Sequence, residues 1–167
     1  MLVAILFSIA FIPMIAEAAR SVRNERELRA AGATEPEGDV YRAMQLVYPA
    51  CFIAILGEAW LRGRTVTGVS IAGAAVFVTA KALKYWAIST LGVRWSFRVL
   101  VPPGSQLARS GPYRYIRHPN YVAVVGEIAG MALMAQAPIA GSISLVVFTV
   151  LILIRIRVEE RALGVRS

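Results

Sequence analysis

Residues 121–155 read YVAVVGEIAGMALMAQAPIAGSISLVVFTVLILIR, and this stretch decides the fold. Between its first residue and the closing arginine it carries one charged side chain, Glu127. A helix crosses the hydrocarbon core of a bilayer in about 20 residues, so the stretch is too long for one ordinary span. The sequence Ala135-Gln136-Ala137-Pro138 near its middle is typical of a turn. We therefore predict a hairpin of two membrane helices, each of about 17 residues.

The composition of the whole chain points to the same environment. Of its 167 residues, 57% are hydrophobic and 17% are charged, whereas a soluble domain has about 25% charged residues. This hydrophobicity excludes global disorder. A single cysteine, Cys51, and a single histidine, His118, exclude a disulfide framework and a multi-histidine metal site, so we expect no metal.

Three further apolar runs precede the hairpin, at residues 1–16, 44–61 and 66–88. The first contains no charge. Ala16-Glu17-Ala18 resembles a signal-peptide cleavage site, but the missing basic n-region favours a first membrane helix. The third run is rich in Gly and Ala, which let membrane helices approach closely.

These runs predict an all-α integral membrane protein with about five transmembrane helices, built as one domain over 1–167. Residues 1–88 are expected to form three helices with a polar connection at 20–42. Four arginines of that connection are spaced by three, which suits one helix face. Residues 89–167 are expected to form the functional core, with a ligand-binding loop, the hairpin and a charged C-terminus.

The distribution of the basic residues predicts how the chain is oriented in the membrane. With five spans, 16 of the 18 Lys and Arg residues fall on one side of the membrane, and only Arg62 and Arg64 fall on the other. Four spans would give a split of 12 against 6. Because cytoplasmic loops collect Lys and Arg, we predict an N-terminus outside and a cytosolic C-terminus. The net charge of +8 therefore predicts contact with membrane lipids and not with nucleic acid.

Two polar clusters flank the hairpin. GPYRYIRHPNY, at 111–121, places Pro119 where the first turn of a helix is expected. The N-terminus of that helix, with His118, would suit a carboxylate. RIRVEERAL, at 155–163, places Arg155 and Glu159 on one helix face. Both clusters also suit a plain interfacial collar of aromatic and basic side chains. Their position on the same predicted side favours a single site.

Glu127 lies six residues past Tyr121 inside an apolar helix. Ionisable groups at membrane depth are candidates for function, although a hydrogen-bonded packing role is equally open. Together with Lys81 and Lys84, Glu127 is expected to line a route by which a lipophilic molecule enters from the bilayer.

The two clusters and their spacing resemble the isoprenylcysteine carboxyl methyltransferase family of membrane enzymes. The likeness covers residues 90–163, and the run Arg-His-Pro-x-Tyr with a Glu-Glu pair about 40 residues later is specific when both flank an apolar hairpin. The N-terminal half departs from the eukaryotic enzymes, which have more spans. The chain is more similar to the small bacterial members, and this likeness implies a place in a bacterial inner membrane.

The resemblance implies a cytosolic pocket for S-adenosylmethionine, with S-adenosylhomocysteine as the product. The residues that match the family's cofactor contacts are Ser105, Gln106, Leu107, Ala108, Tyr113, His118, Pro119, Asn120, Tyr121 and Glu159. Arg155 matches the arginine that faces the substrate, which makes it the expected catalytic residue. Glu159 would bind the cofactor's ammonium or ribose, and Glu127 is the second expected substrate residue.

The implied reaction is O-methylation of a lipophilic acceptor. Two acceptor classes stay open, a lipidic phenol such as an alkylresorcinol or alkylpyrone, and the carboxylate of a prenylcysteine. A carboxylate needs no base at neutral pH, whereas a phenol has a pKa near 10 and needs deprotonation or a cationic neighbour. The alternatives are a phospholipid N-methyltransferase and a non-catalytic membrane carrier or assembly subunit.

Overall fold

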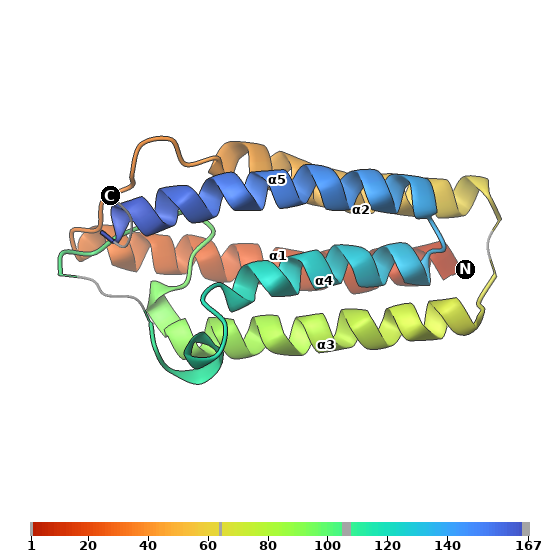
Figure 1. The fold of residues 1–167 in the computed structure, drawn as a ribbon, viewed down its shortest axis with the longest axis horizontal. Coiled ribbons are helices and arrows are strands. Elements are labelled where there is room, and N and C mark those ends of the chain that lie inside the picture. Colours follow the sequence, from red (N-terminus) through yellow and green to blue (C-terminus); the bar gives the residue numbers. More distant parts are fainter. Residues whose placement is uncertain (1, 64, 105–107, 165–167) are drawn as a thin grey trace.

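The computed structural model describes residues 2–63, 65–104 and 108–164, and in these ranges the chain is helical, with no strand. The five α-helices run lengthwise in one bundle (Figure 1). They are α1 (Leu2–Ala30), α2 (Tyr41–Leu61), α3 (Gly68–Leu91), α4 (Pro119–Met134) and α5 (Pro138–Ala162), joined in part by the short 3-10 helices η1 (Gly92–Arg94) and η2 (Gly111–Arg114). The predicted all-α fold is confirmed.

The predicted hairpin is present and its turn is short. Helix α4 ends at Met134 and α5 begins at Pro138, which needs no backbone donor in the first turn of a helix. Gln136 takes the left-handed conformation, with a φ of 50°. Its side-chain amide donates to the Thr65 carbonyl at 2.5 Å, so the turn is tied to the connection between α2 and α3.

Among the described residues, four helices are long and apolar enough to cross a membrane, namely α1, α2, α3 and α5. Helix α4 is a shorter apolar helix of 16 residues. At 1.5 Å per residue it spans about 24 Å, less than the roughly 30 Å hydrocarbon core. The two arms of the hairpin are therefore unequal. The predicted length of about 17 residues holds for α4 and is wrong for α5, which has 25 residues because it continues through the charged run to Ala162.

The polar connection predicted at 20–42 is shorter in the structure, because α1 continues to Ala30. Residues on one face of this extension are buried, in keeping with the spacing of its arginines. Asn24 is 2% exposed, and its side-chain amide donates to the carbonyls of Gly92 (3.1 Å) and Trp95 (2.6 Å). These contacts hold the end of α1 against the segment after α3, and only residues 31–40 connect α1 to α2.

Small residues bring α3 and α4 into close contact, as predicted for the Gly- and Ala-rich run. A Cβ added at Gly130 would lie 2.6 Å from the Phe77 nitrogen and 2.8 Å from its Cα. A Cβ at Gly126 would lie 2.9 Å from the Ala80 Cβ. The first of these neighbours is backbone, so no side-chain rearrangement makes room.

This packing gives a stability prediction. Gly130→Ala is expected to lower the free energy of unfolding by about 1–3 kcal/mol, because the new methyl group overpacks a helix contact. Gly57→Ala in α2 is the matched control, since nothing lies within 4 Å of its added Cβ. Thermal unfolding in detergent measures both. Equal melting temperatures for the two variants would contradict the close packing of α3 on α4.

The bundle has two distinct ends (Figure 1). One end carries the 31–40 connection, the start of α4 and the C-terminus. The other carries the N-terminus and the turn between α4 and α5. The two polar clusters flanking the hairpin therefore meet at the same end, as the sequence predicted. Which end faces the cytosol stays a prediction.

Candidate functional site

A cavity with mixed polar and apolar walls opens at the end of the bundle where α5 finishes, and we call it the polar cavity. Its lining residues come from the α3–η1 region, the 95–102 segment, the η2 region and the ends of α4 and α5. They are Leu91, Arg94, Trp95, Ser96, Arg98, Val99, Leu100, Val101, Pro102, Ala108, Tyr113, Arg117, His118, Asn120, Tyr121, Arg155, Glu159 and Leu163.

The polar cavity gathers most of the residues that the sequence singled out. Those that line it are Ala108, Tyr113, His118, Asn120, Tyr121, Arg155 and Glu159. Pro119 is buried in the first turn of α4 and does not line the cavity. Ser105, Gln106 and Leu107 lie outside the described residues.

A turn places Tyr113 in the cavity wall. Gly111 opens η2 with a φ of 55°, a backbone conformation that glycine adopts without strain. Burial raises the pKa of the Tyr113 hydroxyl, and the nearby carboxylate of Glu159 raises it further. Tyr113 is therefore a neutral hydrogen-bonding group at physiological pH.

His118 precedes α4 and lies close to both acids of the Glu-Glu pair. Its Nδ1 is 3.8 Å from Glu159 Oε2, and its Nε2 is 3.4 Å from Glu160 Oε1. A histidine between two carboxylates is suited to orienting them. It is less suited to binding a third carboxylate, which the sequence had suggested for it.

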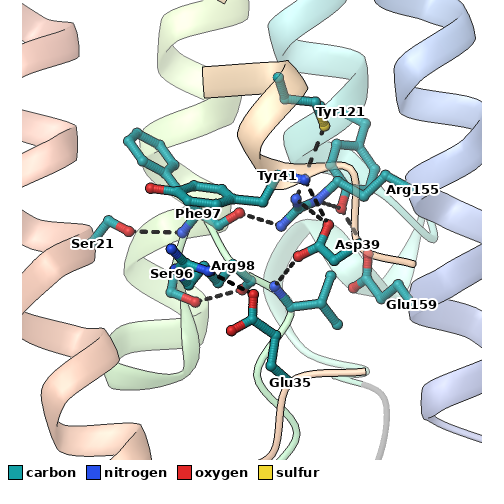
Figure 2. Close-up of polar contacts among 12 residues, drawn as sticks. Ser21, Glu35, Asp39, Tyr41, Ser96, Phe97, Arg98, Tyr121, Arg155 and Glu159 are labelled. Atoms are coloured by element: carbon teal, nitrogen blue, oxygen red, sulfur yellow. Dashed lines mark hydrogen bonds and ion pairs between the residues drawn. The ribbon is translucent and has the colours of Figure 1, made fainter. Parts of the chain in front are cut away.

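Tyr121 and Arg155 form part of the wall of the polar cavity, and they lie beside each other (Figure 2). The Tyr121 hydroxyl donates to Glu159 Oε2 at 2.9 Å and accepts from Arg155 Nε at 2.9 Å. Arg155 is 5% exposed. A continuous chain of contacts thus leads from the Glu159 carboxylate to the buried guanidinium.

A second, mainly apolar cavity shares Tyr121 and Arg155 with the polar cavity, and we call it the apolar cavity. Most of its lining comes from α1, α2, α4 and α5. The lining residues are Met14, Ala18, Ser21, Val22, Tyr41, Met44, Gln45, Tyr48, Pro49, Lys84, Ser96, Phe97, Asn120, Tyr121, Val124, Phe148 and Arg155. Four residues line both cavities, namely Ser96, Asn120, Tyr121 and Arg155.

Residues 95–101, which we call the strap, contribute lining residues to both cavities. The end of α1 and the 31–40 connection hold the strap in place. Ser21 accepts a hydrogen bond from the Phe97 backbone at 2.8 Å, and Thr34 pairs with Val101 through two backbone hydrogen bonds. Arg98 lies 2.7 Å from Glu35 and 3.3 Å from Glu25.

Glu35 is ionised in this arrangement. Burial alone would raise the pKa of its carboxyl group, but hydrogen bonds and charge from Arg29 and Arg98 hold that pKa below the usual value. The ion pair of Glu35 with Arg98 therefore persists at neutral pH.

Sequence reasoning missed Asp39, the ion-pair partner of Arg155. Arg155 Nη1 donates to Asp39 Oδ1 at 2.9 Å, and the Asp39 side chain is 3% exposed. The available signal was an acidic residue two positions before an apolar helix. It gave no indication of a partner 116 residues away.

Glu127 lies in a buried charge cluster with Glu17, Lys81 and Lys84. Glu17 lies 2.8 Å from Lys81 and 2.5 Å from Lys84, and Glu127 lies 3.2 and 3.3 Å from the same two ammonium groups. The Tyr48 hydroxyl also donates to Glu127. Two acids and two bases balance each other, which a bundle inside a membrane requires.

Glu127 itself lines neither cavity. Its partners Lys84 and Tyr48 do line the apolar cavity, so Glu127 reaches that cavity only through them. Its role toward a substrate stays a prediction. The sequence predicted no partner for Glu17, because it marked that residue only as the end of the first apolar run.

The charge cluster gives a second stability prediction. Glu17→Gln is expected to destabilise the protein by about 3–5 kcal/mol, because it leaves two buried ammonium groups with one carboxylate. Arg62→Gln is the control. Its pair with Glu58 is 36% exposed on the arginine side and is worth less than about 1 kcal/mol. A Glu17 variant that unfolds no earlier than the control would contradict this assignment.

The fold and the paired cavities define an all-α protein with membrane-crossing helices and a site at one end. Residues 73–165 match the model of the isoprenylcysteine carboxyl methyltransferase family. The chain therefore belongs to this family of membrane methyltransferases. The match includes the polar cavity's residues and leaves out α1, α2 and Asp39.

Two curated relatives resemble nearly the whole chain. A Bacillus subtilis protein, "Uncharacterized protein YpbQ", is 31% identical over 159 residues, covering 95% of each chain. A Haemophilus influenzae protein, "Uncharacterized protein", is 28% identical over 145 residues, covering 86% of this chain and 84% of its own. No solved structure matches the chain significantly.

Proposed function

We propose that the protein uses S-adenosylmethionine to O-methylate a lipophilic acceptor. One observation carries this proposal: Tyr121 and Arg155 line both the polar and the apolar cavity. A methyl transfer needs a polar cofactor and an apolar acceptor to meet across a short, dry contact. A polar cavity and an apolar cavity that share lining residues suit that requirement.

The residues of the polar cavity suit the cofactor's groups. The buried Asn120 Oδ1 has no hydrogen-bond partner among the described residues, and it is available to accept from an amino group. The side chain of Glu159 is 29% exposed, so it can bind an ammonium or ribose hydroxyls. Arg94 has no carboxylate partner within the described ranges, and it suits the cofactor's carboxylate better than His118 does.

When bound, S-adenosylmethionine would supply an electrophilic methyl group. Arg155 would orient the acceptor oxygen, since it is buried and held in place by several contacts. Tyr121 and the strap would exclude water from the shared wall. Positioning and exclusion of water can supply much of the acceleration of such a displacement.

The acceptor is proposed to enter the apolar cavity from the bilayer, with its oxygen toward Arg155. A lipidic phenol and a prenylcysteine carboxylate both fit this orientation, since each joins one oxygen-bearing head to an apolar tail. The site end of the bundle is proposed to face the cytosol of a bacterial cell, where the cofactor is made.

Cofactor binding is the first test. Titration calorimetry on the purified protein is expected to detect S-adenosylmethionine binding. Glu159→Gln is expected to raise the Kd about tenfold, which is about 1.4 kcal/mol. Arg157→Gln, an exposed change on the same helix, is the matched control and should leave the Kd within about twofold. A wild-type protein that binds no cofactor would contradict the proposed function.

A panel of acceptors with methyl-labelled cofactor tests the reaction. We expect label on a prenylcysteine or an alkylresorcinol, and none on phosphatidylethanolamine. Arg155→Lys should lower kcat about 100-fold, because a lysine cannot keep the contacts that fix the guanidinium. Labelled phosphatidylethanolamine would instead support the N-methyltransferase alternative, and no labelled product at all would support a carrier or assembly subunit.

A further inference from the structure

Asp39 accepts three hydrogen bonds beside the site, yet it lines neither cavity. Its Oδ1 accepts from Arg155 Nη1 at 2.9 Å and from the Tyr41 backbone at 3.1 Å. Its Oδ2 accepts from the Val99 backbone at 3.1 Å. Figure 2 shows the carboxylate between Arg155 and the strap. Asp39 therefore acts on the site only through other residues.

The Arg155 guanidinium is held at each of its three nitrogen atoms. Nε donates to the Tyr121 hydroxyl, Nη2 to the Phe97 carbonyl, and Nη1 to Asp39. Asp39 supplies the negative charge in this set. A planar group bonded at three corners has one orientation, and a buried cation without its anion is strongly destabilised.

Asp39 also fixes the strap relative to Arg155. The same carboxylate binds the Val99 backbone, two residues after the Phe97 carbonyl that accepts from Arg155. Moving or neutralising Asp39 would therefore disturb two of the three contacts of Arg155. This makes the 31–40 connection part of the site, although it lies outside the family match.

We propose that Asp39 is a positioning residue for methyl transfer, which holds Arg155 in the wall between the cofactor and acceptor cavities. This inference rests on the proposed function, because it assigns Arg155 to the acceptor. Asp39 is not proposed to touch either substrate or to act as a base, since both of its oxygens are occupied.

Asp39→Asn tests the proposal with little change of shape. The amide has one acceptor oxygen, so its NH2 group must face either the Arg155 guanidinium or the Val99 N–H, which are both donors. We expect kcat to fall about 30-fold, with the Kd for S-adenosylmethionine within about threefold of wild type. Asp39→Glu keeps the charge and should recover part of the loss, since it displaces the guanidinium without unpairing it.

Glu37→Gln is the matched control in the same connection. Glu37 is exposed and lines neither cavity, so kcat should stay within about threefold. The decisive comparison repeats Asp39→Asn in an Arg155→Lys background. In that background Asp39→Asn should lower kcat by less than about threefold. If Asp39 acts through Arg155, the effects of the two substitutions are not additive.

The outcomes separate the two proposals. An active wild-type enzyme whose kcat is unchanged by Asp39→Asn would overturn this inference alone. So would a loss of equal size in the wild-type and Arg155→Lys backgrounds, which a general structural role produces. A wild-type protein without cofactor binding or transfer would contradict the proposed function, and this inference would fall with it.

Discussion

A guanidinium buried inside a membrane bundle is tolerable only when it is paired, and the site depends on how Arg155 meets this constraint. Its charge is balanced by Asp39 and its remaining contacts come from Tyr121 and the Phe97 carbonyl. These partners belong to the 31–40 connection, to α4 and to the strap. Satisfying one cation therefore draws these three segments together at the end of the bundle, where Arg155 lines both cavities.

The same constraint acts a second time, deeper in the bundle. Glu17 and Glu127 both pair with Lys81 and Lys84. These ion pairs connect α1, α3 and α4, whereas the close packing at Gly130 connects only α3 and α4. Apolar helices in a bilayer gain little from hydrophobic contact with each other, so their association depends on the close packing of small residues and on paired polar groups. Glu17, Lys81, Lys84 and Glu127 serve as links of this kind.

The sequence predicted the local features well. The turn at 135–137, the Gly-rich packing of α3 and the meeting of the two polar clusters all follow from patterns within one helix or hairpin. The partners of Arg155 and Glu17 could not be predicted, because Asp39 and Lys84 lie far from them in the chain and carry no pattern of their own. The length of α1 was also underestimated. Its polar last turns are stabilised by hydrogen bonds from Asn24 to Gly92 and Trp95, which only the folded chain provides.

The division of the chain suggests a division of roles. The family match at 73–165 contains the residues that line the polar cavity. Met14, Met44 and Tyr48, which line the apolar cavity, precede the matched residues. Under the proposed function, the matched part holds the cofactor and the N-terminal helices select the acceptor. Relatives that share the C-terminal half could then differ in acceptor while keeping one cofactor site.

The most direct measurement is an experimental structure of the protein with S-adenosylhomocysteine bound. The proposed function predicts the ligand in the polar cavity, between Tyr113 and Glu159, with its sulfur toward Arg155 and the apolar cavity. A ligand whose sulfur points away from Arg155, or a polar cavity that stays empty at saturating ligand, would contradict the claim that the methyl group passes across the wall formed by Tyr121 and Arg155.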